Sequence, residues 1–431
     1  MNNPQPVLIM ILFWAFHGIH AQTADVNASV DTKDMLFYYQ GLKEGCHIIF
    51  GQNLGHGDAI TTNYNPLVEQ VFVNTGKRLA LVGSEYGFST QPDLFAANLT
   101  LINHWKTGGI VTISWRANNP WNGMLADNIE HQGETGLLVT PGNQAYDSWM
   151  NQLTQIGDVL EMLRDSGVVV LWRPLPEMNG TWFWWGHSPG STDTSSFINL
   201  WKQIFQYLTE ERQLHNLLWV YSVSHSFDSP VDLYYPGDEF VDIVGINIFD
   251  DNAAYIYPAD YDKLKALGKP MGLTEFAPTL PHPIGNYDYT ILLENLQNMW
   301  DDYVFSYAWH DFPGGINSYA GNLNENLLLQ DPCAITLDDI QLSLSSNQIL
   351  PDKNFSLYPN PVDENCLIRS NSPNLTIDQL SVFDSNGKCL EIISLSSQQN
   401  YVFNTAALRA GIYCILIESN GKLYPQKLAK Y

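Results

Sequence analysis

One stretch decides the fold: Val168-Val-Val-Leu-Trp-Arg-Pro-Leu-Pro-Glu177. Its first half is a short apolar run, which is typical of a strand buried on both faces of a parallel sheet. The preceding segment, 146–163, repeats apolar residues at helical spacing. A helix followed by a buried strand and then by a polar loop is one unit of a βα repeat.

The same unit recurs along the chain. Eight apolar runs predict strands at His47–Gln52, Leu79–Gly83, Ile110–Trp115, Val168–Arg173, Leu217–Val223, Val241–Asn247, Met271–Glu275 and Val304–Trp309. Amphipathic segments separate them, so the pattern predicts a (β/α)8 TIM barrel over residues 45–338. The rival is an open doubly wound sheet. Such a sheet usually has a phosphate loop after its first strand, and the glycine-rich stretch Gly51–Gly57 does not match that loop's GxGxxG pattern.

Composition narrows the possible partners. The chain has 431 residues, and 45 acidic against 20 basic side chains give a formal charge of −25, which disfavours binding to nucleic acid. Its 13 Trp and 22 Tyr include several in polar, turn-like contexts, where flat aromatic faces suit stacking on sugar rings.

The two ends of the chain differ from its middle. Residues 1–21 contain the apolar run 7–16 followed by Ala21, and this predicts a secretory signal peptide rather than a membrane span. Residues 339–354 are polar and predict a linker. Residues 355–431 alternate in short pieces separated by turn signals such as Asn386-Gly387, and they predict a small β-sandwich-like domain.

The five cysteines fit an exported protein. Cys46 and Cys333 bracket the predicted barrel, so we expect a bridge between its ends. Cys389 and Cys414 are candidates for a second bridge within the tail. The odd count leaves at least one cysteine unpaired, and no Cys/His spacing matches a zinc site.

Two glutamates carry the strongest chemical signal. Glu177 follows the fourth predicted strand and precedes the aromatic run Thr181-Trp-Phe-Trp-Trp185. Loss of hydration beside these rings favours the protonated carboxyl that a general acid needs. Glu275 ends the seventh strand, so both carboxyls are expected at the mouth of the barrel. Paired carboxylates are what glycoside hydrolysis requires, and this chemistry needs neither cofactor nor metal.

These residues stand in motifs that resemble glycoside hydrolase family 26, the β-mannanase family of a retaining (β/α)8 clan. Trp172-Arg-Pro-Leu-Pro-Glu-Met-Asn-Gly-Thr-Trp-Phe-Trp-Trp-Gly186 resembles its acid/base signature, and Leu273-Thr-Glu-Phe276 resembles its nucleophile strand. Gly108–Pro120 and Tyr234–Asp250 resemble its third-strand and sixth-strand motifs.

The resemblance implies a secreted endo-β-1,4-mannanase that acts by retaining double displacement. It implies that Glu177 is the acid/base and Glu275 the nucleophile. It also implies substrate contacts from Arg116, Asn179, Trp182, Phe249 and Trp309, with the two tryptophans as sugar platforms.

Three positions depart from the family pattern. The family usually has His where this chain has Pro176, His where it has Arg116, and Tyr where it has Phe249. Each change removes or alters a polar partner near the reacting sugar. The alternatives are therefore activity on another β-glycan, such as mixed-linkage glucan or β-1,3-xylan, and a weakly active or non-catalytic glycan-binding protein.

The tail resembles a type IX (Por) secretion sorting domain, through Phe355-Ser-Leu-Tyr-Pro-Asn-Pro361, Ala410-Gly-Ile-Tyr413 and the closing residues 426–431. The rival is a small carbohydrate-binding module, which usually carries Trp, and this chain has no Trp after Trp309. The resemblance implies a secreted or cell-surface protein whose partners are a polysaccharide and the outer-membrane secretion machinery. We expect a monomer.

Overall fold

The computed structural model describes residues 22–340 and 354–431, with internal gaps at 44, 88, 131–132, 189–192, 226–227, 251–257, 279–284 and 385–388. Three predicted features fall wholly or largely outside the described residues. These are the signal peptide 1–21, most of the linker (341–353) and the turn at Asn386-Gly387.

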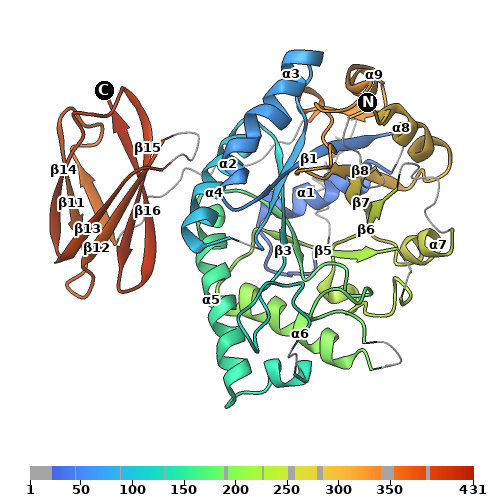
Figure 1. The fold of residues 1–431 in the computed structure, drawn as a ribbon, viewed down its shortest axis with the longest axis horizontal. Coiled ribbons are helices and arrows are strands. Elements are labelled where there is room, and N and C mark those ends of the chain that lie inside the picture. Colours follow the sequence, from blue (N-terminus) through green and yellow to red (C-terminus); the bar gives the residue numbers. More distant parts are fainter. Residues whose placement is uncertain are drawn as a thin grey trace, which may run out of the picture.

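Eight parallel strands form a closed barrel (Figure 1). They are β1 Ile48–His56, β2 Leu81–Glu85, β3 Ile110–Trp115, β4 Val170–Pro174, β5 Leu217–Ser224, β6 Ile243–Phe249, β7 Met271–Ala277 and β8 Tyr303–Ala308. Each overlaps one predicted strand. Because β1 pairs in parallel with both β2 and β8, the sheet has no open edge at this point. The barrel prediction is confirmed, and the open-sheet rival is wrong.

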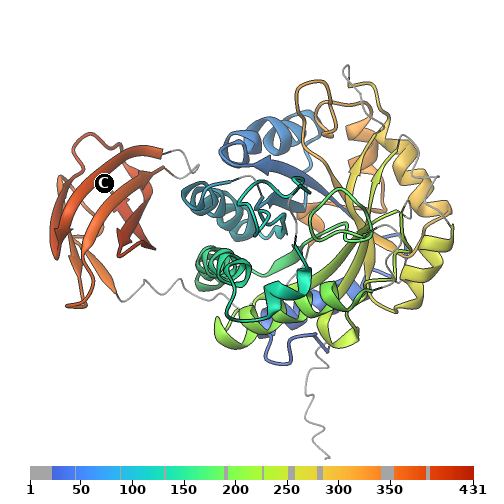
Figure 2. The ribbon, with the colours of Figure 1, turned by 60° about the horizontal axis from the view of Figure 1, so that its bottom comes forward.

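Helices surround the strands (Figure 2). Those described are α1 Val30–Gly41, α2 Ala59–Tyr64, α3 Gln70–Thr75, α4 Gln91–Lys106, α5 Gln144–Asp165, α6 Ser195–Gln206, α7 Pro258–Ala266, α8 Tyr289–Asn298 and α9 Glu325–Gln330. Helix α5 begins where the Asn143 side chain accepts a hydrogen bond from the backbone N–H of Tyr146. Its apolar stripe, including Trp149 and Leu153, is fully buried in the main core.

The segment before β1 closes the amino-terminal end of the barrel. Met35 and Tyr39 of α1 are fully buried in a second apolar cluster with residues of the strands. The backbone N–H of Ala24 donates to Asp242 Oδ1 at 2.7 Å, just before β6. Asp25 Oδ2 lies 2.7 Å from His215 Nδ1, just before β5. Residues 24–41, which precede the predicted boundary at 45, therefore pack on the barrel.

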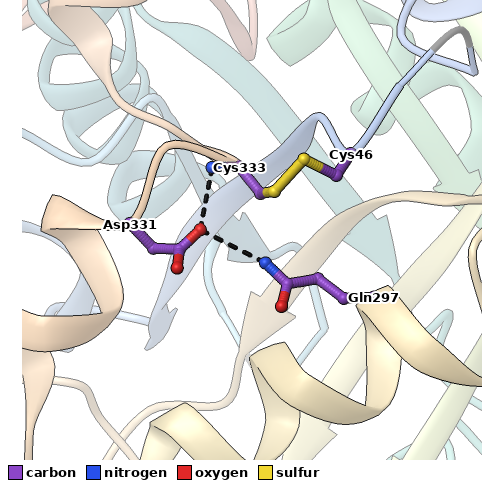
Figure 3. Close-up of a disulfide and its surroundings, with 4 residues drawn as sticks. All are labelled: Cys46, Gln297, Asp331 and Cys333. Carbon is purple, nitrogen blue, oxygen red and sulfur yellow. Dashed lines mark hydrogen bonds between the residues drawn. A yellow bond between two sulfur atoms is a disulfide. The ribbon is translucent and has the colours of Figure 1, made fainter.

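A disulfide joins the two ends of the barrel segment (Figure 3). Cys46 precedes β1, and Cys333 precedes β9 Ala334–Ile335, which pairs with the start of β1. Asp331 Oδ1 accepts hydrogen bonds from the Cys333 backbone N–H at 2.8 Å and from Gln297 Nε2 at 3.2 Å. The predicted Cys46–Cys333 bridge is confirmed.

The C-terminal region forms two antiparallel sheets around one core (Figure 1). The sheet β10-β11-β14 contains Phe355–Tyr358, Asn365–Ser370 and Asn400–Asn404. The sheet β13-β12-β15-β16 contains Cys389–Gln398, Ile377–Phe383, Gly411–Ser419 and Lys422–Lys430. Ile368 from the first sheet and Leu380 from the second are fully buried in the shared core, which confirms the all-β prediction.

The proposed Cys389–Cys414 bridge is wrong. Both residues pair with Phe383 of β12, Cys389 from β13 on one side and Cys414 from β15 on the other. Two strand spacings of about 4.8 Å separate them, which exceeds the reach of a disulfide. Both are free, as is the buried Cys366.

The disulfide is expected to stabilise the barrel because it closes a loop with a sequence separation of 287 residues. Replacing Cys46 and Cys333 together by Ser should lower the free energy of unfolding by about 2–5 kcal/mol. Urea titration followed by tryptophan fluorescence measures this in the barrel alone, since no Trp follows Trp309. Cys389→Ser is the control, and equal midpoints for the double variant and the wild type would contradict the expectation.

Candidate active site

The two predicted catalytic glutamates lie at the carboxyl ends of strands, as a barrel active site requires. Glu275 is on β7, and Glu177 is in the loop that follows β4. Their exposed fractions are 0% and 6%. Burial of two carboxyl groups is unfavourable unless each has hydrogen-bonding partners, so the partners define the chemistry of the site.

Glu275 is held by two arginines. Arg116 Nη2 donates to Glu275 Oε1 at 2.9 Å and lies 3.0 Å from Oε2. Arg173 Nη1 donates to Oε1 at 3.1 Å and to the Thr274 carbonyl at 3.0 Å. Arg116 follows β3 and Arg173 is in β4, so strands distant in sequence fix one carboxylate.

A second carboxylate completes this cluster. Arg116 Nη1 donates to Glu85 Oε2 at the end of β2, and Glu85 Oε1 lies 3.7 Å from Arg173 Nη2. The four side chains are all less than 8% exposed. Two cations thus face two anions in a site with little water, where ionic interactions are strong.

The pKa of Glu275 is raised to about 7. Burial is the largest cause, and the guanidinium of Arg116 opposes it. The negative charges of Glu85 and Glu177 add to the rise, whereas Arg173 opposes it. The ionised form that a nucleophile needs therefore depends on the two arginines.

Glu177 has different partners. Trp182 Nε1 donates to its Oε2 at 2.7 Å, and Asn247 Nδ2 donates to its Oε1 at 2.9 Å. The backbone of Glu177 has a φ of 59°, and its N–H donates to the Ser222 carbonyl on β5 at 2.8 Å. A left-handed conformation is uncommon for a non-glycine residue and is often found at functional sites.

Asn247 on β6 connects the two glutamates. Its Oδ1 accepts hydrogen bonds from Thr274 Oγ1 at 2.8 Å and from Ser222 Oγ at 3.2 Å. The amide nitrogen is therefore turned toward Glu177. The strand register pairs Asn247 with Glu275 on β7, so one side chain links the environment of both carboxyls.

Aromatic rings surround the site at the mouth. Trp182, Phe183, Phe249 and Trp309 are partly exposed. The rings of Phe249 and Trp309 meet edge to face at 6.1 Å, and the Arg116 guanidinium carbon lies 5.2 Å from the Trp309 ring centre. Such partly exposed rings next to buried carboxyls match the surface that a sugar chain needs.

The other residues of the aromatic run have structural roles. Trp184 and Trp185 are each 2% exposed. Their indole N–H groups donate to the carbonyls of Ala117 at 2.8 Å and Pro176 at 2.9 Å. These two hydrogen bonds hold the loop that carries Glu177.

Asn179 is fully buried. Its Nδ2 donates to the Ser224 carbonyl at 2.6 Å, and its Oδ1 accepts from the Ser224 N–H at 2.9 Å. Its side chain thus ties the loop of Glu177 to the end of β5. The sequence-based prediction that Asn179 contacts substrate stays a prediction.

Sequence reasoning did not identify Glu85, Arg173 and Asn247 as functional residues. Each lies within a strand that is otherwise mostly apolar. A charged or amide side chain in such a strand needs a buried partner, and that signal was available in the sequence.

Comparison with known proteins identifies the family. Residues 24–339 match the model of glycosyl hydrolase family 26. The chain belongs to that family. Residues 356–430 match the model of a secretion system C-terminal sorting domain, which implies export to the cell surface or the extracellular space.

Two curated relatives of this family 26 hydrolase are mannan endo-1,4-beta-mannosidases. The one from Caldalkalibacillus mannanilyticus, named A and B, is 31% identical over 315 residues, which are 68% of this chain and 58% of that relative. The chain thus covers somewhat more than half the length of that protein. One from Bacillus subtilis is 30% identical over 323 residues, 70% of this chain and 87% of the relative.

Comparison with solved structures also finds mannanases. Bacillus subtilis mannanase BCman matches with a TM-score of 0.67 and 28% sequence identity, over 76% of this chain and 98% of that one. In the part of the family 26 hydrolase that the structure describes, no cluster of three or more His, Cys, Asp or Glu residues could hold a metal ion. Nor is any described helix both long and apolar enough to cross a membrane.

Trp182→Phe tests the link between the aromatic loop and Glu177. The ring is retained while the N–H that donates to Glu177 Oε2 is lost. A hydrogen bond to a charged group contributes about 1.5–3 kcal/mol, so kcat/KM for glycan hydrolysis should fall by about 10- to 100-fold.

The control is Trp201→Phe on α6, which removes an indole donor to the Phe240 backbone carbonyl. It should affect thermal stability more than kcat/KM. Equal kcat/KM values for Trp182→Phe and the wild type would contradict a role for this hydrogen bond.

Proposed function

We propose that this family 26 hydrolase is a secreted endo-β-1,4-mannanase that acts by retaining double displacement. The observation that carries the proposal is the unequal surroundings of its two buried glutamates. Glu275 faces two guanidinium groups, which favour its ionised form. Glu177 faces neutral donors from Trp182 and Asn247, and among the described residues none of its side-chain hydrogen-bond donors is a cation. The first arrangement suits a nucleophile and the second an acid/base.

In the first step, a Glu275 oxygen attacks the anomeric carbon and forms an ester bond. The glycosidic C–O bond breaks, and its electron pair goes to the leaving oxygen, which takes the proton of Glu177. In the second step, water attacks the same carbon and gives a proton to Glu177. The ester bond breaks and its electron pair returns to Glu275, so both residues regain their starting states.

This mechanism requires direct attack, so we propose a separation of about 5–5.5 Å between the two carboxyl groups. Two contacts support it. Asn247 donates to Glu177 at 2.9 Å, and its backbone is paired in register with that of Glu275. The two glutamates therefore lie on either side of one asparagine.

The substrate assignment rests on the relatives and on the aromatic rings. The two curated relatives described above are named mannan endo-1,4-beta-mannosidases. In our proposal, Trp182 and Trp309 are platforms for mannose rings, Phe249 extends the Trp309 surface, and Arg116 contacts the sugar bound above Glu275. Asn179 acts by holding the Glu177 loop.

A second candidate function is activity on another β-glycan, and the three departures from the family pattern favour it. Pro176 precedes Glu177, Arg116 donates to Glu275, and Phe249 meets Trp309. One altered polar contact near a reacting sugar changes the discrimination between sugars. The test is therefore sugar release from mannan, glucomannan, mixed-linkage glucan and β-1,3-xylan. Release from none of them would instead support a glycan-binding protein.

Product stereochemistry tests the mechanism. Proton NMR recorded immediately after mixing with manno-oligosaccharide should show the β-anomer first, because two displacements retain the configuration. Glu275→Ala should lose activity by several orders of magnitude. Initial release of the α-anomer would refute the nucleophile role of Glu275.

The tail is proposed to be dispensable for catalysis and to bring the protein to the outer-membrane secretion machinery. It has its own core, and the barrel closes without it. Deletion of residues 345–431 should leave kcat/KM unchanged within about twofold, as is usual for a change outside the reacting site, while the protein accumulates inside the cell. A folded, soluble truncation without activity would contradict this expectation.

A further inference from the structure

Arg116 is the residue that sets this active site apart. It follows β3 at a position where family 26 usually has a histidine, and it is only 6% exposed. Its guanidinium carbon lies 5.6 Å from the Phe183 ring centre and 5.2 Å from that of Trp309. Both rings are within the distance at which a guanidinium is attracted to an aromatic face.

Arg116 is a donor to the carboxylate of Glu275. The family usually has a tyrosine hydroxyl near its nucleophile, and Phe249 at the matching position has no donor to offer. In the described part of the chain, the side-chain hydrogen bonds to the Glu275 carboxylate come from Arg116 and Arg173. Arg116 thus supplies hydrogen bonds to both oxygens, together with a full positive charge.

Glu85 limits the effect of that charge. It binds the same guanidinium through Nη1 while Glu275 binds through Nη2. Two carboxylates therefore share one cation, and each reduces the stabilisation that the cation gives to the other.

We propose that Arg116 and Glu85 form a charge balance that sets how readily Glu275 ionises and reacts, with Arg116 as a positioning residue that replaces the missing hydroxyl. This inference rests on the proposed role of Glu275 as nucleophile. Beyond its proposed sugar contact, Arg116, which follows β3, acts on the reaction through Glu275, and so does Glu85 on β2.

The need for both residues follows from the change of charge during the reaction. When Glu275 forms the ester, its negative charge disappears. Arg116 would then be a buried cation without its main partner, which is strongly unfavourable. Glu85 keeps the cation paired during the intermediate, and Arg116 stabilises the Glu275 carboxylate as it leaves in the second step.

Other ionisable groups face this cluster and must be considered. Arg173 from β4 and Glu177 from the following loop interact electrostatically with Glu275. Tyr307 on β8 lies beneath the Arg173 guanidinium at 5.0 Å, and His310 after β8 interacts with Arg116. Burial keeps Tyr307 and His310 uncharged near neutral pH, since the pKa of Tyr307 is raised well above 10 and that of His310 is lowered to about 4. His225 after β5 interacts with Glu177, and burial lowers its pKa too.

The test is a direct titration of Glu275 in the full chain. Protein labelled with 13C at the glutamate side-chain carboxyl is titrated by NMR, and Glu275→Gln assigns the signal. Arg116→Gln should move the midpoint to higher pH by about one unit or more, because an opposite charge is lost. Glu85→Gln should move it to lower pH, because a like charge is lost.

The variants include internal controls. Arg116→Lys retains the charge without the contact to both oxygens, so its midpoint should lie between those of the wild type and Arg116→Gln. Arg164→Gln removes an arginine that is paired at the surface with Asp165, and it should leave the midpoint unchanged. If Arg116→Gln does not fold, the direction of the midpoint shift in Glu85→Gln alone tests the proposal. Unchanged midpoints, or shifts of both variants in one direction, would overturn the proposal.

A kinetic measurement separates this inference from the proposed function. The acid limb of kcat/KM for mannan should move in parallel with each NMR midpoint. If mannan is not cleaved but the midpoints shift as stated, the mannanase proposal fails and the charge balance stands. If mannan is cleaved and the acid limb does not move in either variant, the mannanase proposal stands and the charge balance is refuted.

Discussion

The active site depends on one constraint: four charged side chains are buried inside the barrel and must neutralise one another. Glu85, Arg173 and Glu275 lie in β2, β4 and β7, and Arg116 directly follows β3. Removal of any one leaves an unpaired charge in a medium of low polarity, which typically costs about 3–5 kcal/mol. The barrel must therefore hold these four strands in one register, and closure of the sheet between β8 and β1 does this.

The rest of the site follows from that cluster. The hydroxyls of Ser222 and Thr274 donate to Asn247 Oδ1 and so orient its amide. The amide nitrogen of Asn247 then donates to Glu177. The indole N–H of Trp182 donates to the other oxygen of Glu177, the proposed acid/base. Outside this polar layer, apolar side chains from the strands and helices form the main core, and the disulfide and the N-terminal segment close the opposite end of the barrel.

Much of the fold and part of the site were predictable from the sequence. Apolar runs identified all eight strands because a parallel strand buried on both faces is almost wholly apolar. Glu275 stood out because it ends such a run, and Glu177 because it closely follows one. Glu85, Arg173 and Asn247 carried a signal as polar side chains in mostly apolar strands, but their partners lie up to 102 residues away in the sequence. Only the folded barrel shows which side chains they bind. The Cys389–Cys414 prediction failed for the same reason. Turn signals in the tail do not show that β12 lies between β13 and β15. The residues proposed to contact sugar follow from the family resemblance and remain proposals.

The central claim is that Glu275, ionised between two arginines, is the nucleophile. Covalent trapping tests it most directly. A 2-deoxy-2-fluoro-mannosyl fluoride forms the ester but slows its hydrolysis, so mass spectrometry of proteolytic fragments locates the modified residue. The account predicts one added sugar on the peptide that contains Glu275 and none in Glu275→Gln. Labelling of a peptide without Glu275, or equal labelling of the variant, would contradict it.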